Sequence, residues 1–152
     1  SLDFGISGKI NAEEVEEKIK KFDIGCVVIT SPTYEGVISD CEKIYDVCKK
    51  CGAYLFVDSA HGAHLPGLHR SSDISVMSLH KTLPSLTQTA VLNVYSESVD
   101  EDTVKHALSV FETSSSSYVL LASIDECANF LTEKKDRFLK FYKNIMNLHF
   151  KI

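Results

Sequence analysis

The sequence predicts an α/β fold in which a mostly parallel β-sheet is flanked by helices. Short apolar, β-branched runs resemble strands buried on both faces, and they alternate with amphipathic helical segments. Polar residues follow several of these runs, at the edge where such sheets bind ligands. The 152 residues, 44% hydrophobic and 24% charged, suit one folded domain rather than a disordered segment.

The first two predicted elements are a helix and a buried strand. Asn11 is suited to cap a helix that runs to about Lys21, because acidic residues follow it and apolar residues recur on one face. Residues 25–30, Gly-Cys-Val-Val-Ile-Thr, predict a strand buried on both faces. Pro32 then breaks the pattern into a loop.

A second helix and strand follow in the same order. Asp40 can cap a helix with an apolar stripe at helical spacing, and Gly52 ends that helix. Residues 53–57 predict another buried strand, with Asp58 at its carboxyl end.

The rest of the chain continues with strands and then becomes helical. A polar run at residues 114–117 separates two of the predicted helices. The predicted elements are strands at residues 73–77 and 88–95, and helices at residues 100–111, 118–131 and 134–148.

Composition narrows the functional classes. The net charge of -5 argues against a nucleic-acid binder that neutralises phosphates, and no apolar run approaches the roughly 20 residues of a membrane span. Five cysteines, an odd number without a visible secretory leader, favour a reducing compartment, so we expect a cytoplasmic protein. Because the chain begins with Ser, we expect it to be processed or to be a piece of a longer protein.

Two polar motifs follow predicted strands and suit one kind of chemistry. Asp58 ends one strand and Ser78-Leu79-His80-Lys81 follows another, so we expect both at one sheet edge. A shielded lysine amine can form an imine with an aldehyde, and a carboxylate can pair with a protonated pyridine nitrogen. Ser78 and His80 offer a hydroxyl and a ring N–H to phosphate oxygens. These are the groups with which proteins use pyridoxal phosphate.

Three longer segments resemble one family of pyridoxal-phosphate enzymes. They are residues 30–36, residues 58–64 and residues 78–88, the last reading Ser-Leu-His-Lys-Thr-Leu-Pro-Ser-Leu-Thr-Gln. Together they resemble the major domain of the Orn/Lys/Arg decarboxylase family, which has fold type I. We expect residues 1–132 to be part of this cofactor-binding domain and residues 133–152 to be a C-terminal helix leaving it, without the small domain.

The resemblance implies a role for each matching residue. Lys81 would bind the cofactor covalently, Asp58 would pair with its pyridine nitrogen, and His61 would lie at the ring edge. These three residues form the implied catalytic set. Ala60 would pack beneath the ring.

The phosphate of the cofactor has its own implied partners. Ser78 and His80 would hold it within one subunit. Thr113 and Ser114 resemble a loop that reaches the phosphate of a neighbouring subunit, so a homo-oligomer built from dimers is expected. The implied function is decarboxylation of lysine, ornithine or arginine to the amine, as part of amino-acid and polyamine metabolism. No nucleic acid, membrane or metal is expected as a partner.

The sequence also departs from the family. The family often has an acid where Ser59 stands, and the segment between His64 and Asp73 looks shorter than usual. The upstream part, with a phosphate-binding turn and a residue stacked on the other ring face, is missing, as is the small domain. We therefore expect these residues alone to be inactive, with an open sheet edge and exposed apolar faces.

Other functional classes remain open. The chain could be a truncated, non-catalytic remnant or a partner subunit of a decarboxylase. It could also be another fold-type-I enzyme, such as an aminotransferase or a lyase acting on another amino acid, because Asp-x-Ala-His and Ser-x-x-Lys are shared across that fold. Ser78-x-x-Lys81 also matches a serine hydrolase motif, but the partner motifs Ser-Asp-Asn and Lys-Thr-Gly are not present.

Metal binding is the last alternative. His61 with His64, or Cys48 with Cys51, could ligate a metal, but neither pair has further ligands at recognisable spacing. The two cysteines also lie at a helix C-terminus, where the dipole disfavours a thiolate. Core packing is the better interpretation for Cys41 and Cys48, which match the apolar stripe of their helix.

Overall fold

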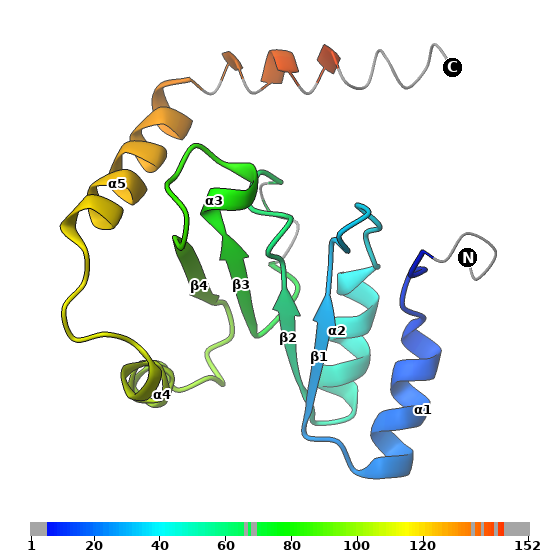
Figure 1. The fold of residues 1–152 in the computed structure, drawn as a ribbon. Coiled ribbons are helices and arrows are strands. Elements are labelled where there is room, and N and C mark those ends of the chain that lie inside the picture. Colours follow the sequence, from blue (N-terminus) through cyan, green and yellow to red (C-terminus); the bar gives the residue numbers. More distant parts are fainter. Residues whose placement is uncertain are drawn as a thin grey trace.

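Four strands form one sheet in a computed structural model of the chain, which describes residues 6–65, 67, 70–134, 136–137, 139–141 and 143–144. The strands follow one another across the sheet in chain order (Figure 1). They are β1 (Cys26–Thr30), β2 (Tyr54–Asp58), β3 (Ile74–Ser78) and β4 (Ala90–Val94). The first three are parallel and β4 is antiparallel to β3. The predicted α/β fold with a mostly parallel sheet is confirmed.

The helices are α1 (Ala12–Phe22), α2 (Cys41–Lys50), α3 (Leu79–Thr82), α4 (Glu101–Phe111) and α5 (Tyr118–Glu133). Four of them were predicted within a few residues of these bounds, and α3 was not predicted. Of the helix predicted over residues 134–148, residues 136–137, 139–141 and 143–144 are helical, and the others, except 134, lie outside the described residues. No described helix combines the length and hydrophobicity needed to cross a bilayer.

Polar side chains cap α1, α2 and α4, and the first two of these caps are predicted from the sequence. The Asn11 side chain accepts a hydrogen bond of 2.7 Å from the backbone N–H of Glu13. Asp40 and Asp100 accept from backbone N–H groups three residues on, at 3.2 and 3.0 Å. Each bond satisfies a backbone donor that the helix leaves unpaired, which stabilises a helix by about 1 kcal/mol.

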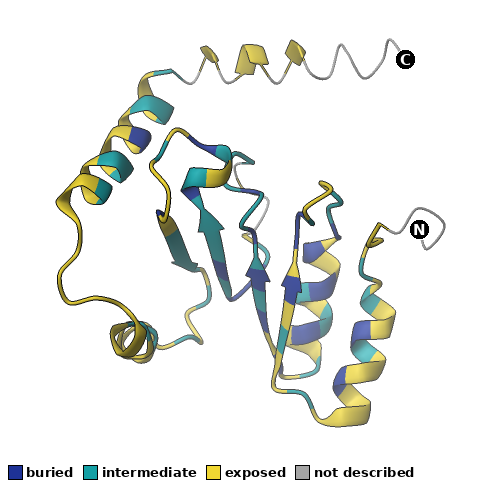
Figure 2. Cartoon of the chain, in the orientation of Figure 1, coloured by how far each residue is buried: buried dark blue, intermediate teal, exposed yellow. Residues whose placement is uncertain are grey.

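Helices α1 and α2 cover one face of β1 and β2 and form the main core with them (Figure 2). Ile44, Leu55 and Val57 are fully buried there. Cys41 and Cys48 are buried in the same cluster, which confirms that they pack in the core. A second cluster lies where Cys127 of α5 packs against Leu79 and Leu83, so α5 lies against α3.

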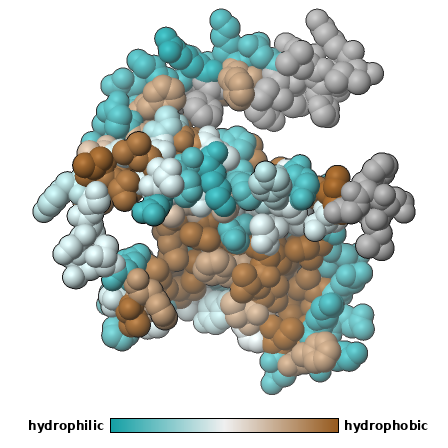
Figure 3. Space-filling view, viewed as in Figure 1, coloured by the Kyte–Doolittle hydropathy of each residue, from teal (hydrophilic) through white to brown (hydrophobic). Residues whose placement is uncertain are grey.

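The other face of β1 has no cover from the described residues. Cys26, Val28 and Thr30 are exposed on it, Val28 at 66%. Figure 3 shows an apolar area over the strands on this side. The prediction that β1 is buried on both faces is therefore wrong for this chain. The physical reason is that α1 and α2 cover a single side of the sheet, and burial of a strand depends on a second layer.

The fourth strand begins later than the sequence predicts. Gln88 has a φ of 78°, which is left-handed backbone that a strand cannot contain. Thr89 is buried and turns the chain into β4, which starts at Ala90. The predicted start of this strand at Gln88 is therefore wrong by two residues.

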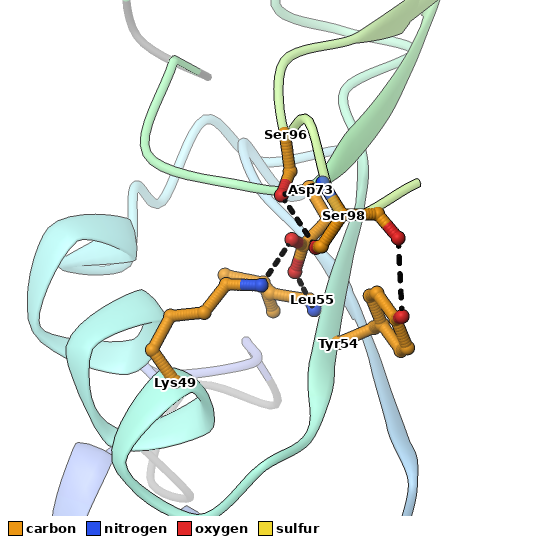
Figure 4. A network of polar contacts seen from close by, with 6 residues as sticks. All are labelled: Lys49, Tyr54, Leu55, Asp73, Ser96 and Ser98. Carbon is orange, nitrogen blue, oxygen red and sulfur yellow. Dashed lines mark hydrogen bonds and ion pairs between the residues drawn. The ribbon is translucent and has the colours of Figure 1, made fainter. Parts of the chain in front are cut away.

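A buried carboxylate joins α2 to the end of the sheet that lies opposite α3 (Figure 4). Asp73 is fully buried, pairs with the ammonium group of Lys49 and accepts a bond of 2.7 Å from the backbone N–H of Leu55. The Lys49 ammonium lies 5.2 Å from the ring centre of Tyr45 and 5.1 Å from that of Tyr54. Burial alone would lower the pKa of Lys49, but hydrogen bonding and attraction to Asp73 raise it overall.

Candidate active site

The structure brings the two polar motifs to one edge of the sheet. Asp58 is the last residue of β2 and pairs in register with Val76 of the neighbouring parallel strand β3. Ser78 ends β3 two residues later, and Lys81 follows in the single turn of α3. Because β2 and β3 are parallel, both motifs lie at the carboxyl edge of the sheet.

Asp58 is held in place by its own turn. One carboxylate oxygen accepts a hydrogen bond of 3.0 Å from the backbone N–H of Ala60. Both residues are half-buried. Among the described residues the second carboxylate oxygen has no hydrogen-bond partner, so it is free to bind a positively charged group.

Ser59 has a structural role that the sequence did not indicate. Its side chain is fully buried, and its hydroxyl donates a hydrogen bond of 2.9 Å to the carbonyl oxygen of Ser31. Its backbone N–H donates to Val76 at 2.8 Å. Ser59 therefore ties the turn that carries Asp58 to β3 and to the loop after β1. The only signal in the sequence is its position directly after Asp58.

The segment after β2 carries two histidines, His61 and His64. The ring of His61 meets that of Tyr34 edge-on, with centroids 5.4 Å apart. The Nδ1 atoms of His61 and His64 and the hydroxyl of Thr82 are buried and have no hydrogen-bond partner among the residues that the structure describes. Burial lowers the pKa of His64. Thr82 was not predicted as a site residue, although it follows Lys81 directly.

The polar side chains at the end of β3 and in α3 include those of Ser78, His80 and Lys81. The Ser78 side chain makes no capping bond to α3, which leaves its hydroxyl available. The Nδ1 atom of His80 lies 2.9 Å from the carbonyl oxygen of Thr89. Lys81 is exposed and has no hydrogen bond or ion pair within the described part of the chain. The shielding from water expected around an imine-forming amine is thus not supplied by these residues.

Thr113 and Ser114 lie apart from this edge. They are exposed in the connection between α4 and α5, which Figure 1 shows away from α3. The Thr113 hydroxyl accepts a bond of 3.1 Å from the backbone N–H of Ser115. The structure therefore does not bring these two residues together with Asp58 and Lys81 in one chain.

Two surface hollows of the described residues lie away from this edge. Both lie along α1 and α2, and neither includes a residue of the edge. Within the described ranges, no three His, Cys, Asp or Glu side chains are grouped so that they could hold a metal ion. What the edge offers is one carboxylate, one amine, hydroxyl groups and imidazole nitrogens. The amine can react with an aldehyde, and the carboxylate can pair with a positively charged group.

Comparison with protein families matches residues 2–149 to the family described as Orn/Lys/Arg decarboxylase, major domain. The arginine decarboxylase of Bacillus subtilis (strain 168) is 34% identical over 132 residues, which cover 81% of this chain and 27% of that protein. The arginine decarboxylase of Halalkalibacterium halodurans is 35% identical over 130 residues, covering 80% and 26%. The chain thus spans about a quarter of the length of these relatives.

Solved structures share the fold. A structure of SPT with PLP superposes with a TM-score of 0.64 at 19% identity, over 86% of this chain and 36% of that one. The crystal structure of mouse CSAD gives a TM-score of 0.52 at 24% identity, over 59% and 22%. These likenesses show the fold alone, which is that of the fold-type-I pyridoxal-phosphate enzymes.

Proposed function

Because the chain belongs to the Orn/Lys/Arg decarboxylase family, we propose that the complete protein removes the α-carboxyl group of a basic amino acid with pyridoxal phosphate as its cofactor. The observation that carries the proposal is the placement of Asp58 and Lys81 at one edge, at the ends of adjacent parallel strands. Among lysine, ornithine and arginine, we propose arginine first, because the relatives named above are arginine decarboxylases.

The residues at this edge fit the cofactor. Buried polar atoms normally find a partner, and each one left without costs about 1–3 kcal/mol. Within the described part of the chain, the Nδ1 atom of His61 and the Thr82 hydroxyl are buried without partners, and the Ser78 hydroxyl makes no capping bond. A ligand that carries phosphate and hydroxyl oxygens would give such groups their missing partners.

Each residue then has a defined task. When bound, pyridoxal phosphate supplies an electron sink for the bond that breaks. The Lys81 amine holds the cofactor covalently, and the free oxygen of Asp58 holds the positive charge on the pyridine nitrogen. Ala60 provides a small side chain beneath the ring. His61, whose ring contacts that of Tyr34, offers a nitrogen at the edge of the cofactor ring that can hold or move a proton.

The phosphate and the subunit contacts complete the proposal. Ser78 and His80 bind the phosphate within one chain, and Thr113 with Ser114 reaches it from a neighbouring copy. Exposed aromatic residues flank that loop: Phe111 is 90% and Tyr118 86% exposed, which supports burial against another subunit. We also propose a cytoplasmic location, supported by five cysteines that are all free.

The test uses the intact protein loaded with pyridoxal phosphate. Borohydride reduction and peptide mapping should place the pyridoxyl label on Lys81, and CO2 release should be fastest with arginine among the three basic amino acids. A Lys81→Arg variant should take no label. A Lys105→Arg variant is the matched control, because Lys105 is exposed on α4 and should not alter labelling.

Two results would overturn the proposal. A label on a lysine other than Lys81 would exclude the covalent assignment. A label on Lys81 without amine formation from any basic amino acid would favour another fold-type-I reaction. That alternative has support from the serine hydroxymethyltransferase of Acinetobacter baumannii, which is 31% identical over 101 residues.

A further inference from the structure

The hydrogen bond from His80 to the backbone fixes which ring nitrogen carries a proton. Nδ1 of His80 lies 2.9 Å from the carbonyl oxygen of Thr89. A carbonyl oxygen can only accept, so Nδ1 must be the donor. The same oxygen also accepts from the backbone N–H of Leu79 at 3.0 Å. Thr89 is 2% exposed. The acceptor is therefore buried and held by the backbone.

This bond determines what the other nitrogen can do. A neutral imidazole has one N–H and one lone pair, so with Nδ1–H given to Thr89 the Nε2 atom of neutral His80 carries a lone pair. A lone pair does not bind a phosphate oxygen. Only the doubly protonated ring offers an Nε2–H, and its hydrogen bond to phosphate is then charge-assisted.

We infer that His80 binds the cofactor phosphate only as an imidazolium ion, with Thr89 as the backbone acceptor that enforces this state. The inference rests on the proposed function, which places the phosphate at Ser78 and His80. The inference adds that the ring of His80 takes up or retains one proton when the phosphate binds. The affinity for the phosphate group is thus highest when His80 is protonated and falls as rising pH removes that proton.

The effect of other titratable groups around His80 on the pH dependence has to be distinguished from the effect of His80 itself. Strands β3 and β4 carry none. Lys81 is adjacent in α3. Asp58 is the last residue of β2, and His61 and His64 follow it. Helix α5, packed against α3, contributes the buried Cys127, and its Asp125 and Glu126 are exposed. A comparison of two ligands that differ only in the phosphate removes the contributions that both ligands share.

The experiment measures dissociation constants of the intact protein for pyridoxal phosphate and for pyridoxal between pH 7 and 9. The phosphate, with a second pKa of about 6, stays dianionic over this range. The preference for pyridoxal phosphate should fall with pH, by up to about tenfold per pH unit for one linked proton. In a His80→Gln variant the preference should not change with pH, because the amide N–H donates at every pH. His106→Gln, on the exposed surface of α4, should behave like the parent protein.

A second readout reports the protonation state of the His80 ring directly. Nitrogen NMR of the histidine rings, with the His80→Gln variant used for assignment, should show both His80 nitrogens protonated when pyridoxal phosphate is bound. The inference would be overturned if the preference for pyridoxal phosphate over pyridoxal did not change with pH in the parent protein, or if the His80 ring were neutral in the complex. With the label still on Lys81, either result would leave the proposed function intact. Absence of label on Lys81 would overturn the proposed function and this inference with it.

Discussion

The hydroxyl of Ser59 donates a hydrogen bond of 2.9 Å to the carbonyl oxygen of Ser31, across a sequence separation of 28 residues. Both residues are fully buried. Because Ser59 follows Asp58 directly, this bond links the turn that carries the carboxylate to the loop after β1. It holds the edge of the sheet together before any ligand binds.

A Ser59→Ala substitution should therefore weaken the edge. The buried carbonyl of Ser31 loses this donor, which costs about 1–3 kcal/mol. Denaturant unfolding of the intact protein should show a lower midpoint than the parent protein. Ser7→Ala, at an exposed position before α1, is the control and should leave the midpoint unchanged. Equal midpoints for the two variants would show that the Ser59 bond contributes nothing to stability.

Asp58 is expected to act through its charge. In Asp58→Asn the amide oxygen can still accept the Ala60 N–H, so the turn and most cofactor binding should be retained. The neutral amide cannot hold a pyridinium charge, and turnover should fall at least a hundredfold, or about 2.7 kcal/mol of barrier. Steady-state kinetics and cofactor absorbance measure the two effects separately. Asp125→Asn on α5 is the control, and parent-like turnover in Asp58→Asn would assign Asp58 a purely structural role.

Much of this architecture follows from local patterns in the sequence. The starts of three helices can be predicted from Asn11, Asp40 and Asp100, because a capping side chain bonds to the backbone within three residues of its own position. The single turn of α3 escapes prediction because four residues are too few to show helical periodicity.

The features that were missed depend on distant parts of the chain. The exposure of Val28 could not be predicted, since the same β-branched run suits a strand covered on one face or on two. The bonds of Ser59 and His80 could not be predicted because their partners are brought near only by the fold. The motifs after β2 and β3 located the candidate site, whereas the hydrogen bonds that arrange it required the structure.

The buried carboxylate of Asp73 is a second stability determinant, at the opposite end of the sheet. Asp73→Ala removes the partner of Lys49 and leaves the backbone N–H of Leu55 without its side-chain acceptor. Lys49 is partly exposed and can turn to water, so we expect a loss of about 2–4 kcal/mol, at or below the usual cost of breaking a buried pair. Thermal or denaturant unfolding measures it. Asp102→Ala, an exposed residue of α4, should cost far less; a similar loss in both would contradict this role for Asp73.

The thiol of Cys48 should make the fold sensitive to alkali. Burial, followed by the charge of Asp73, raises the pKa of Cys48 from about 9 to about 11. A group whose pKa is raised by folding contributes stability below its unfolded pKa and loses it as pH rises through the folded value. Unfolding midpoints should therefore decline from about pH 9 to about 11, and less so in Cys48→Ala. An identical pH profile in that variant would exclude Cys48 as the source.

The reversed direction of β4 determines where fusion partners can be attached. Strand β4 runs away from α3, and the turn after it, at Ser96 and Ser98, lies beside Asp73 at the far end of the sheet, about 17 Å from the edge with Lys81. Helix α5 then returns, so that Cys127 packs against Leu79. A reporter domain inserted at the turn would lie away from the edge that carries Asp58 and Lys81. The same reporter joined directly after Glu133 would lie in the neighbourhood of α3, close to the edge that carries Lys81.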